Sequence, residues 1–154
     1  MEELNFDIIV VGGGPAGSSA AHIAAKNGGT VVLIEKEKEI AETVRTSGVT
    51  WISDVKKFGI TDECYNPIKK FSFCSPKNSV TISDDVAKAA VLDVRKTYKF
   101  LARKAQNAGV KIFVGTNVTD VLRDSSGKCI GVIAKSQDRQ IQFNGKVIID
   151  ASGF

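Results

Sequence analysis

Three glycines near the start of the chain, Gly12, Gly14 and Gly17, restrict what it can fold into more than any other feature. They follow the apolar run Ile8–Val11, which predicts a strand buried on both faces, and precede an alanine-rich stretch that predicts a helix over 18–26. The first glycine permits a tight turn, and the second lets a pyrophosphate approach the backbone. The third lets the helix pack closely on the strand. Together they predict a dinucleotide-binding unit.

The residues around these glycines support the same interpretation. Pro15 suits a first helical turn, where no backbone N–H is needed, and Gly28-Gly29 predicts the end of the helix. Val31–Ile34 predicts a second buried strand, and Glu35 follows it. We expect the Glu35 carboxylate to accept hydrogen bonds from the adenosine ribose, which disfavours NADP, and the helix N-terminus to face the pyrophosphate. The alternative is a tight turn that binds no ligand.

Composition narrows the class of protein. With 154 residues and a net charge of +4, the chain is expected to form about one domain. No apolar run approaches the roughly 20 residues of a transmembrane helix, and the acidic start does not resemble a signal peptide, so a cytoplasmic protein is expected. Basic residues form no block, and no nucleic-acid partner is expected. Without C-x-x-C spacing or a second histidine beside His22, no metal site is predicted, and the cysteines are expected to be reduced.

The middle of the chain mixes helix and strand signals. A short helix is predicted over 50–58, with Trp51, Ile52 and Val55 on one face. A longer amphipathic helix is predicted from Asp93, its N-cap, to Ala108. Strands are predicted at 70–73, 80–83 and 110–114.

The region after residue 116 decides which dinucleotide is expected. A nicotinamide-binding Rossmann domain would continue with a helical crossover. This chain instead shows strand-like runs at 117–123, 129–136 and 140–143, with a turn at Asn144-Gly145-Lys146 before the buried strand 147–150. The expected fold is therefore α/β, a Rossmann-like FAD-binding parallel sheet with a three-stranded antiparallel β-meander crossover. The expected cofactor is FAD, with NAD as the alternative.

The chain resembles the geranylgeranyl reductase family, in the p-hydroxybenzoate hydroxylase branch of the glutathione-reductase-type FAD fold. The resemblance covers essentially the whole chain and rests on VVGGGPAGSSAA, VVLIEK, VRTSGV, LDVRKTYKFLARKAQNAGV and VIIDASGF. It implies a flavin-dependent enzyme that saturates isoprenoid double bonds with electrons from an external donor, and it is compatible with peripheral contact with a membrane. Phe71 and Phe73 are candidates for a lipid-facing surface, or alternatively for the core.

The resemblance also implies a set of FAD-binding residues: Gly12, Gly14, Pro15, Ala16, Gly17, Glu35, Lys36, Arg45, Ser47, Gly48, Arg95, Asp150, Ala151 and Gly153. Arg95 opposes the dipole of its own helix, which a nearby pyrophosphate would relieve; a solvated arginine is the alternative. The D-A-S-G segment that ends the chain's last strand matches a family motif, or is an ordinary turn. Many family members carry a Cys-Gly-rich stretch where this chain has Ser47-Gly48.

The family's second FAD motif, its substrate-binding sheet and its lid over the flavin ring have no counterpart in these 154 residues. We therefore expect residues 1–154 to be the N-terminal part of an FAD-binding domain, inactive alone and without an identifiable catalytic residue, because the flavin carries the hydride chemistry. A flavin-dependent monooxygenase or halogenase is an alternative of the same fold. A prenyl-binding carrier protein is the non-enzymatic alternative.

Overall fold

The computed structural model describes residues 2–153. The chain forms two compact units. The first contains the residues up to Thr43 and those from Tyr98 onward, and the second is Val44–Thr97. Each unit is a separate body and is described by itself.

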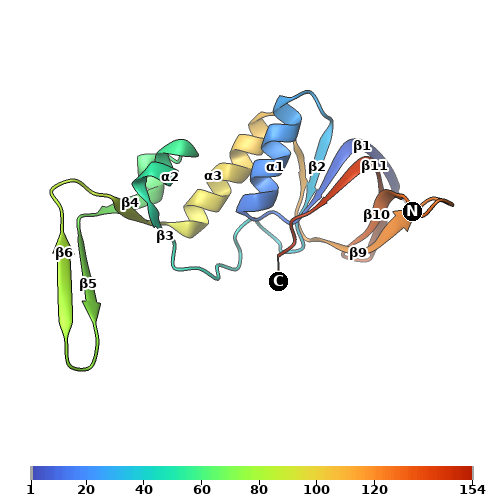
Figure 1. Cartoon of the computed structure of the whole chain (residues 1–154). Helices are drawn as coiled ribbons and strands as arrows, with labels where there is room; N and C mark the ends of the chain where they lie inside the picture. Colours follow the sequence, from blue (N-terminus) through green and yellow to red (C-terminus); the bar gives the residue numbers. More distant parts are fainter. Residues whose placement is uncertain (1, 154) are drawn as a thin grey trace. The chain divides into compact units, whose positions relative to one another are not determined.

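The first unit is built on a six-stranded sheet in the order β8-β2-β1-β11-β10-β9 (Figure 1). Its strands are β1 (Glu2–Val11), β2 (Val31–Ile34), β8 (Lys111–Phe113), β9 (Thr116–Arg123), β10 (Cys129–Ser136) and β11 (Arg139–Asp150). The strands from β8 to β11 in this order run parallel, whereas β11, β10 and β9 run antiparallel. The predicted parallel sheet with an antiparallel meander is confirmed.

One turn within the meander is predicted wrongly. Asn144-Gly145-Lys146 is no turn, because the third meander strand and the strand expected at 147–150 are one continuous strand, β11. Gly145 pairs with Phe6 of β1, and a Cβ at Gly145 would lie 2.8 Å from Cδ1 of Ile9. The glycine here permits close packing within a strand, which is a second common reason for glycine in a sheet.

The two faces of this sheet have different coverings. On one face, helix α1 (Pro15–Lys26) and the part of helix α3 (Val94–Asn107) that belongs to this unit pack on alternate strand residues such as Val10 and Leu33. On the other face, Ile9 and Val32 form a core with Phe143 and other residues of the meander strands. Strand β9 contacts β2 although three strands (β1, β11 and β10) lie between them in the order of the sheet, so the meander curls over this second face.

The second unit contains two small sheets. Strands β3 (Val49–Trp51), β7 (Ala89–Leu92) and β4 (Tyr65–Ile68) form an antiparallel sheet in that order. Strands β5 (Lys70–Cys74) and β6 (Ser79–Ser83) form a hairpin by themselves, as predicted. Helix α2 (Ile52–Lys57) and a 3₁₀ turn (Asp62–Cys64) complete the unit.

The predicted helix over 50–58 is partly wrong. It starts only at Ile52, because the strand-favouring residues Val49, Thr50 and Trp51 pair with β7 instead. Trp51 therefore does not share a buried helix face with Val55: Val55 is buried, whereas Trp51 is 61% exposed.

None of the helices in the described residues has both the length and the apolar composition of a membrane-spanning helix.

Candidate functional site

The turn between β1 and α1 shows why its glycines are required. Gly12 has a φ of +105°, and a Cβ there would lie 2.6 Å from the carbonyl carbon of Ala151. A Cβ at Gly17 would overlap the carbonyl oxygen of Gly12. A Cβ at Gly14, in contrast, meets no atom within 4 Å. The first and third glycines therefore serve the fold, while the second leaves open space at the start of the helix, as expected for a phosphate-binding turn.

The residues of α1 itself place no negative charge at its N-terminus. Pro15 and Ala16 begin the helix, with Gly14 at the N-cap position. In the described part of the chain no side chain caps this end, and the first turn contains no acid. Backbone N–H groups and the positive end of the helix dipole are left for an anionic ligand.

Glu35 lies at the carboxyl end of β2 and its carboxylate is held by backbone groups. Oε2 accepts a hydrogen bond from the N–H of Gly13 at 2.6 Å, and Oε1 accepts one from the N–H of Glu37 at 2.9 Å. Backbone hydrogen bonds connect Glu35 to the end of β8 and the start of β9. Its N–H donates to the carbonyl of Phe113 at 2.8 Å, and its carbonyl accepts the N–H of Thr116 at 2.9 Å. Each carboxylate oxygen keeps a further lone pair for a ligand hydroxyl.

The D-A-S-G segment closes the same end of the sheet. The N–H of Ala151 donates to Val11 at 2.8 Å, which places this segment beside the glycine turn. Hydrogen bonds from the Ser152 hydroxyl at 2.7 Å and from its backbone N–H at 3.0 Å lower the pKa of Asp150. Gly153 follows with a φ of +72°, a conformation that favours glycine.

A cavity of about 330 Å³ lies where β1, β2 and β11 end. This is the edge at which open parallel sheets bind ligands. Of the predicted residues it is lined by Gly12, Glu35, Lys36 and Asp150. Its other walls come from the meander and its approach, including Thr116, Asn117, Val118, Val132 and Ile148. Apolar walls with a few polar groups at the rim suit a nucleoside.

The prediction from sequence did not include the meander residues of this cavity, nor Ser152. Thr116 and Asn117 follow Gly115, which has a φ of +59°, at the carboxyl end of β8. A Gly-Thr-Asn turn after a parallel strand was the available signal, because such turns lie at the ligand-binding edge. Val118, Val132 and Ile148 read only as core residues of strands.

The second unit holds the remaining predicted residues. Arg45 and Ser47 are exposed in the segment before β3. Gly48 is buried with a φ of +75°, its carbonyl accepts the N–H of Leu92 at 2.9 Å, and a Cβ would lie 2.8 Å from the Leu92 oxygen. A requirement of the fold therefore explains Gly48, while the roles of Arg45 and Ser47 toward a cofactor stay predictions.

Arg95 is exposed in the first turn of α3. The predicted N-cap, Asp93, is confirmed, since its Oδ1 accepts the N–H of Lys96 at 3.0 Å. That hydrogen bond, together with ion-pair contacts to Lys96 and the charge of Arg95, lowers the pKa of Asp93. The Asp93 carboxylate thus offsets part of the unfavourable interaction between Arg95 and the helix dipole.

Comparison with known proteins agrees with this geometry. The model of the FAD dependent oxidoreductase family matches residues 7–154. A digeranylgeranylglycerophospholipid reductase of Methanocaldococcus jannaschii is 37% identical, over 99% of this chain and 40% of the relative. The chain therefore spans about 40% of the length of this curated relative.

Two solved structures are also similar to this chain. A geranylgeranyl bacteriochlorophyll reductase-like protein of Thermoplasma acidophilum superposes with a TM-score of 0.89 at 29% identity, over 99% of this chain and 40% of that one. A flavin-dependent brominase superposes with a TM-score of 0.76 at 26% identity, over 97% and 38%. The predicted fold, the predicted family resemblance and FAD as the cofactor are confirmed by these matches.

Proposed function

Because this chain belongs to the FAD dependent oxidoreductase family, we propose that it is the FAD-binding part of a prenyl-lipid reductase of the geranylgeranyl reductase type. The complete enzyme takes electrons from an external donor and adds hydrogen to isoprenoid double bonds. The observation that carries this proposal is the similarity to a digeranylgeranylglycerophospholipid reductase over 99% of the chain. The chain supplies the site for the adenosine and pyrophosphate half of the cofactor.

The residues of the first unit fit FAD. Open space at Gly14 leaves room for a phosphate beside the backbone, and the uncapped N-terminus of α1 supplies N–H donors. The Glu35 carboxylate would accept hydrogen bonds from the ribose hydroxyls, and the hydrogen bonds that it accepts from the N–H groups of Gly13 and Glu37 fix its direction. The apolar meander walls exclude water from the base. When bound, FAD supplies the hydride chemistry, and the chain binds and orients it.

The remaining site residues are assigned within this proposal. Lys36 follows Glu35 in the sequence and lines the same cavity. Arg45, Ser47, Gly48 and Arg95 of the second unit are assigned to FAD binding by the family resemblance alone. The protein acts in the cytoplasm, with peripheral contact with the membrane that holds a small-molecule or lipid substrate, and it has no nucleic-acid partner.

The test begins with the cofactor. The purified protein is expected to be yellow and to release FAD on heating, as measured by its visible spectrum and by chromatography. The complete enzyme, reduced anaerobically and supplied with a prenylated lipid, is expected to increase the lipid's mass by one H2 per saturated double bond. Protein that stays colourless after addition of FAD would contradict the proposal at its first step.

A flavin-dependent halogenase or monooxygenase is the second candidate, supported by the brominase with its TM-score of 0.76. Such an enzyme consumes oxygen, whereas the reductase works without it. Turnover of an aromatic substrate that depends on oxygen, with no anaerobic reduction of an alkene, would favour this candidate.

A further inference from the structure

Ser18 is a polar residue on the buried face of α1. Its exposed fraction is 0%, and so is that of Ala21, one turn further along the same face. An alanine would fill the position of Ser18 without a polar atom, whereas a buried hydroxyl requires a hydrogen-bond partner. The choice of serine here is therefore explained by what its hydroxyl binds.

The hydroxyl of Ser18 binds a backbone carbonyl of the glycine turn. It donates to the oxygen of Gly13 at 3.2 Å, five residues earlier in the chain and outside the helix. The backbone N–H of Ser18 donates to the oxygen of Gly14 at 2.9 Å, which is the ordinary bond of an α-helix. A serine within a helix more commonly bonds a carbonyl three or four residues before it. Ser18 instead holds two successive carbonyl groups of the turn.

Peptide geometry turns this contact into a direction for an N–H group. The C=O and the N–H of a trans peptide point in opposite directions, and no peptide bond in the described residues is cis. Because the Gly13 carbonyl points to the Ser18 hydroxyl, the N–H of Gly14 points away from it, out of the buried face of the helix. Gly14 is also the residue at which an added Cβ would meet no atom within 4 Å.

The neighbouring donors of the turn are already used. The N–H of Gly12 donates to the last carbonyl of β2 at 2.7 Å, and the N–H of Gly13 donates to Oε2 of Glu35 at 2.6 Å. Pro15 has no N–H to offer. In this part of the turn, the N–H of Gly14 is therefore the donor that is left for a ligand.

Without the Ser18 hydroxyl, the peptide between Gly13 and Gly14 would be free to turn over. Gly14 has a φ of −67°, and a half turn of the peptide would carry this angle into the positive range that glycine tolerates. The reversed peptide would present a carbonyl oxygen in place of the N–H. Such an oxygen would repel a phosphate, so the orientation of this one peptide decides whether the turn binds an anion.

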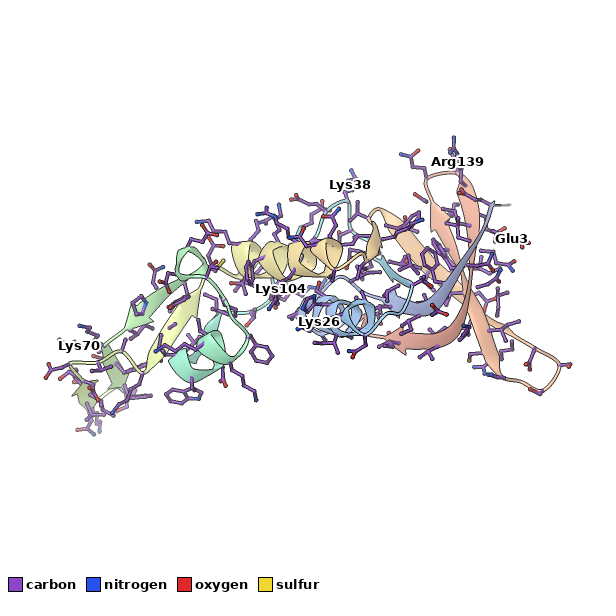
Figure 2. All side chains as sticks on the ribbon, turned by 90° about the horizontal axis from the view of Figure 1, so that it is seen from above. Glu3, Lys26, Lys38, Lys70, Lys104 and Arg139 are labelled. Carbon is purple, nitrogen blue, oxygen red and sulfur yellow. The ribbon has the colours of Figure 1, made fainter. Side chains whose placement is uncertain are left out.

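The helix that carries Ser18 is held in place by α3. Ala21 belongs to one buried cluster with Ala102 of α3. Figure 2 shows α1, which ends at Lys26, beside α3, which carries Lys104. Because this packing holds α1, the hydroxyl can set the conformation of the glycine turn instead of moving with it.

We propose that Ser18 is a positioning residue for the pyrophosphate of FAD. Its hydroxyl holds the peptide between Gly13 and Gly14 in the orientation that directs the Gly14 N–H at a phosphate oxygen, where it donates a charge-assisted hydrogen bond. This inference rests on the proposed function, because it concerns the cofactor of that site. It adds to the three glycines a side chain that their spacing does not include.

The test compares ADP with adenosine, which lacks the phosphates, by calorimetric titration. Ser18→Ala is expected to weaken ADP binding about tenfold, as for the loss of one hydrogen bond to a charged group, and to leave the adenosine affinity unchanged. A general loosening of the site would weaken both ligands alike. Ser19→Ala makes the same change at the next, half-buried position and should alter neither affinity. Val110→Ala, in the core just before β8, should lower the Tm and leave the ratio of the two affinities unchanged.

A second measurement needs no variant. In the wild type, the amide proton resonance of Gly14 should move downfield when ADP is added, whereas adenosine should leave it in place. Equal ADP affinity in Ser18→Ala, equal losses of ADP and adenosine affinity, or a Gly14 resonance that does not respond to ADP would each overturn the inference. Wild-type protein that binds neither ADP nor FAD would instead count against the proposed function.

Discussion

At the scale of single residues, Glu35 combines a structural role with its proposed binding role. Its two carboxylate oxygens accept N–H groups from the glycine turn and from the loop after β2, at 2.6 and 2.9 Å. The carboxylate therefore joins two of the strand ends that form the cavity. A substitution should affect both the folded protein and its affinity for the nucleotide.

Glu35→Ala is expected to weaken ADP binding by about one to two orders of magnitude, following the roughly 1.5–3 kcal/mol of a charged hydrogen bond. It should also lower the free energy of unfolding by about 1–3 kcal/mol, because the N–H of Gly13 loses its acceptor. Calorimetric titration and chemical denaturation separate the two effects. Glu37→Gln is the control, and an unchanged ADP affinity in Glu35→Ala would refute the ribose assignment.

Asp7 gives a prediction about pH. Its carboxylate accepts hydrogen bonds from Lys146 at 2.6 Å and from the hydroxyl and N–H of Thr30 at 2.6 and 2.9 Å. These contacts, with Lys146 first, hold the pKa of Asp7 well below its ordinary 3.8. A lowered folded-state pKa stabilises the protein above pH 3.8 and ceases to do so as the pH falls below that value. The Tm difference between the wild type and Asp7→Asn should therefore be constant near neutrality and shrink below pH 3.8. A difference independent of pH down to the acid transition would contradict this.

At the scale of elements, the β1–α1 turn separates two requirements that the glycine spacing combines. Gly17→Ala would force α1 away from the Gly12 carbonyl, and should cost about 1–3 kcal/mol of stability as well as FAD binding. The Cβ introduced by Gly14→Ala would meet no atom within 4 Å, and the backbone of Gly14 has an ordinary φ of −67°. This variant should therefore fold normally and lose only FAD affinity. Thermal unfolding and flavin fluorescence measure both. Equal Tm losses in the two variants would show that Gly14 serves the fold.

The elements also show what sequence can predict. The glycine turn, α1, β2, the hairpin and α3 follow from local patterns, because each has its own periodicity and its own end signals. The short strands β3, β4 and β7 carry no such pattern, since pairing across the second unit defines them. The continuity of β11 through Asn144 and Gly145 was not predicted, because an Asn-Gly pair signals a turn locally while pairing with β1 holds it extended. The cavity walls at Val118 and Val132 could not be predicted, because these residues reach the cavity only when the whole sheet curls.

At the scale of the whole molecule, the two units differ in how deeply their strands are buried. All four residues of β2 are buried, whereas all five residues of β6 are exposed. Such exposed, locally paired segments open at low free-energy cost.

Hydrogen exchange is therefore expected to be slowest at β1, β2 and the second half of β11 and fastest at β5 and β6. Addition of FAD should slow exchange at the glycine turn and leave the hairpin unaffected. Protection of the hairpin equal to that of β2 in the absence of any partner would contradict this expectation.

The pairing of β1 with β11 has a consequence for how the protein is made. Glu2 lies opposite Ile141 and Val11 opposite Asp150, so the centre of the sheet joins residues that are almost a full chain length apart. Contacts of such separation form late and slow folding. Until β11 has been synthesised, the edge of β1 with which it pairs stays open and apolar, whereas β2 already has β8 on its other side. The nascent chain must therefore remain unaggregated until β11 emerges from the ribosome.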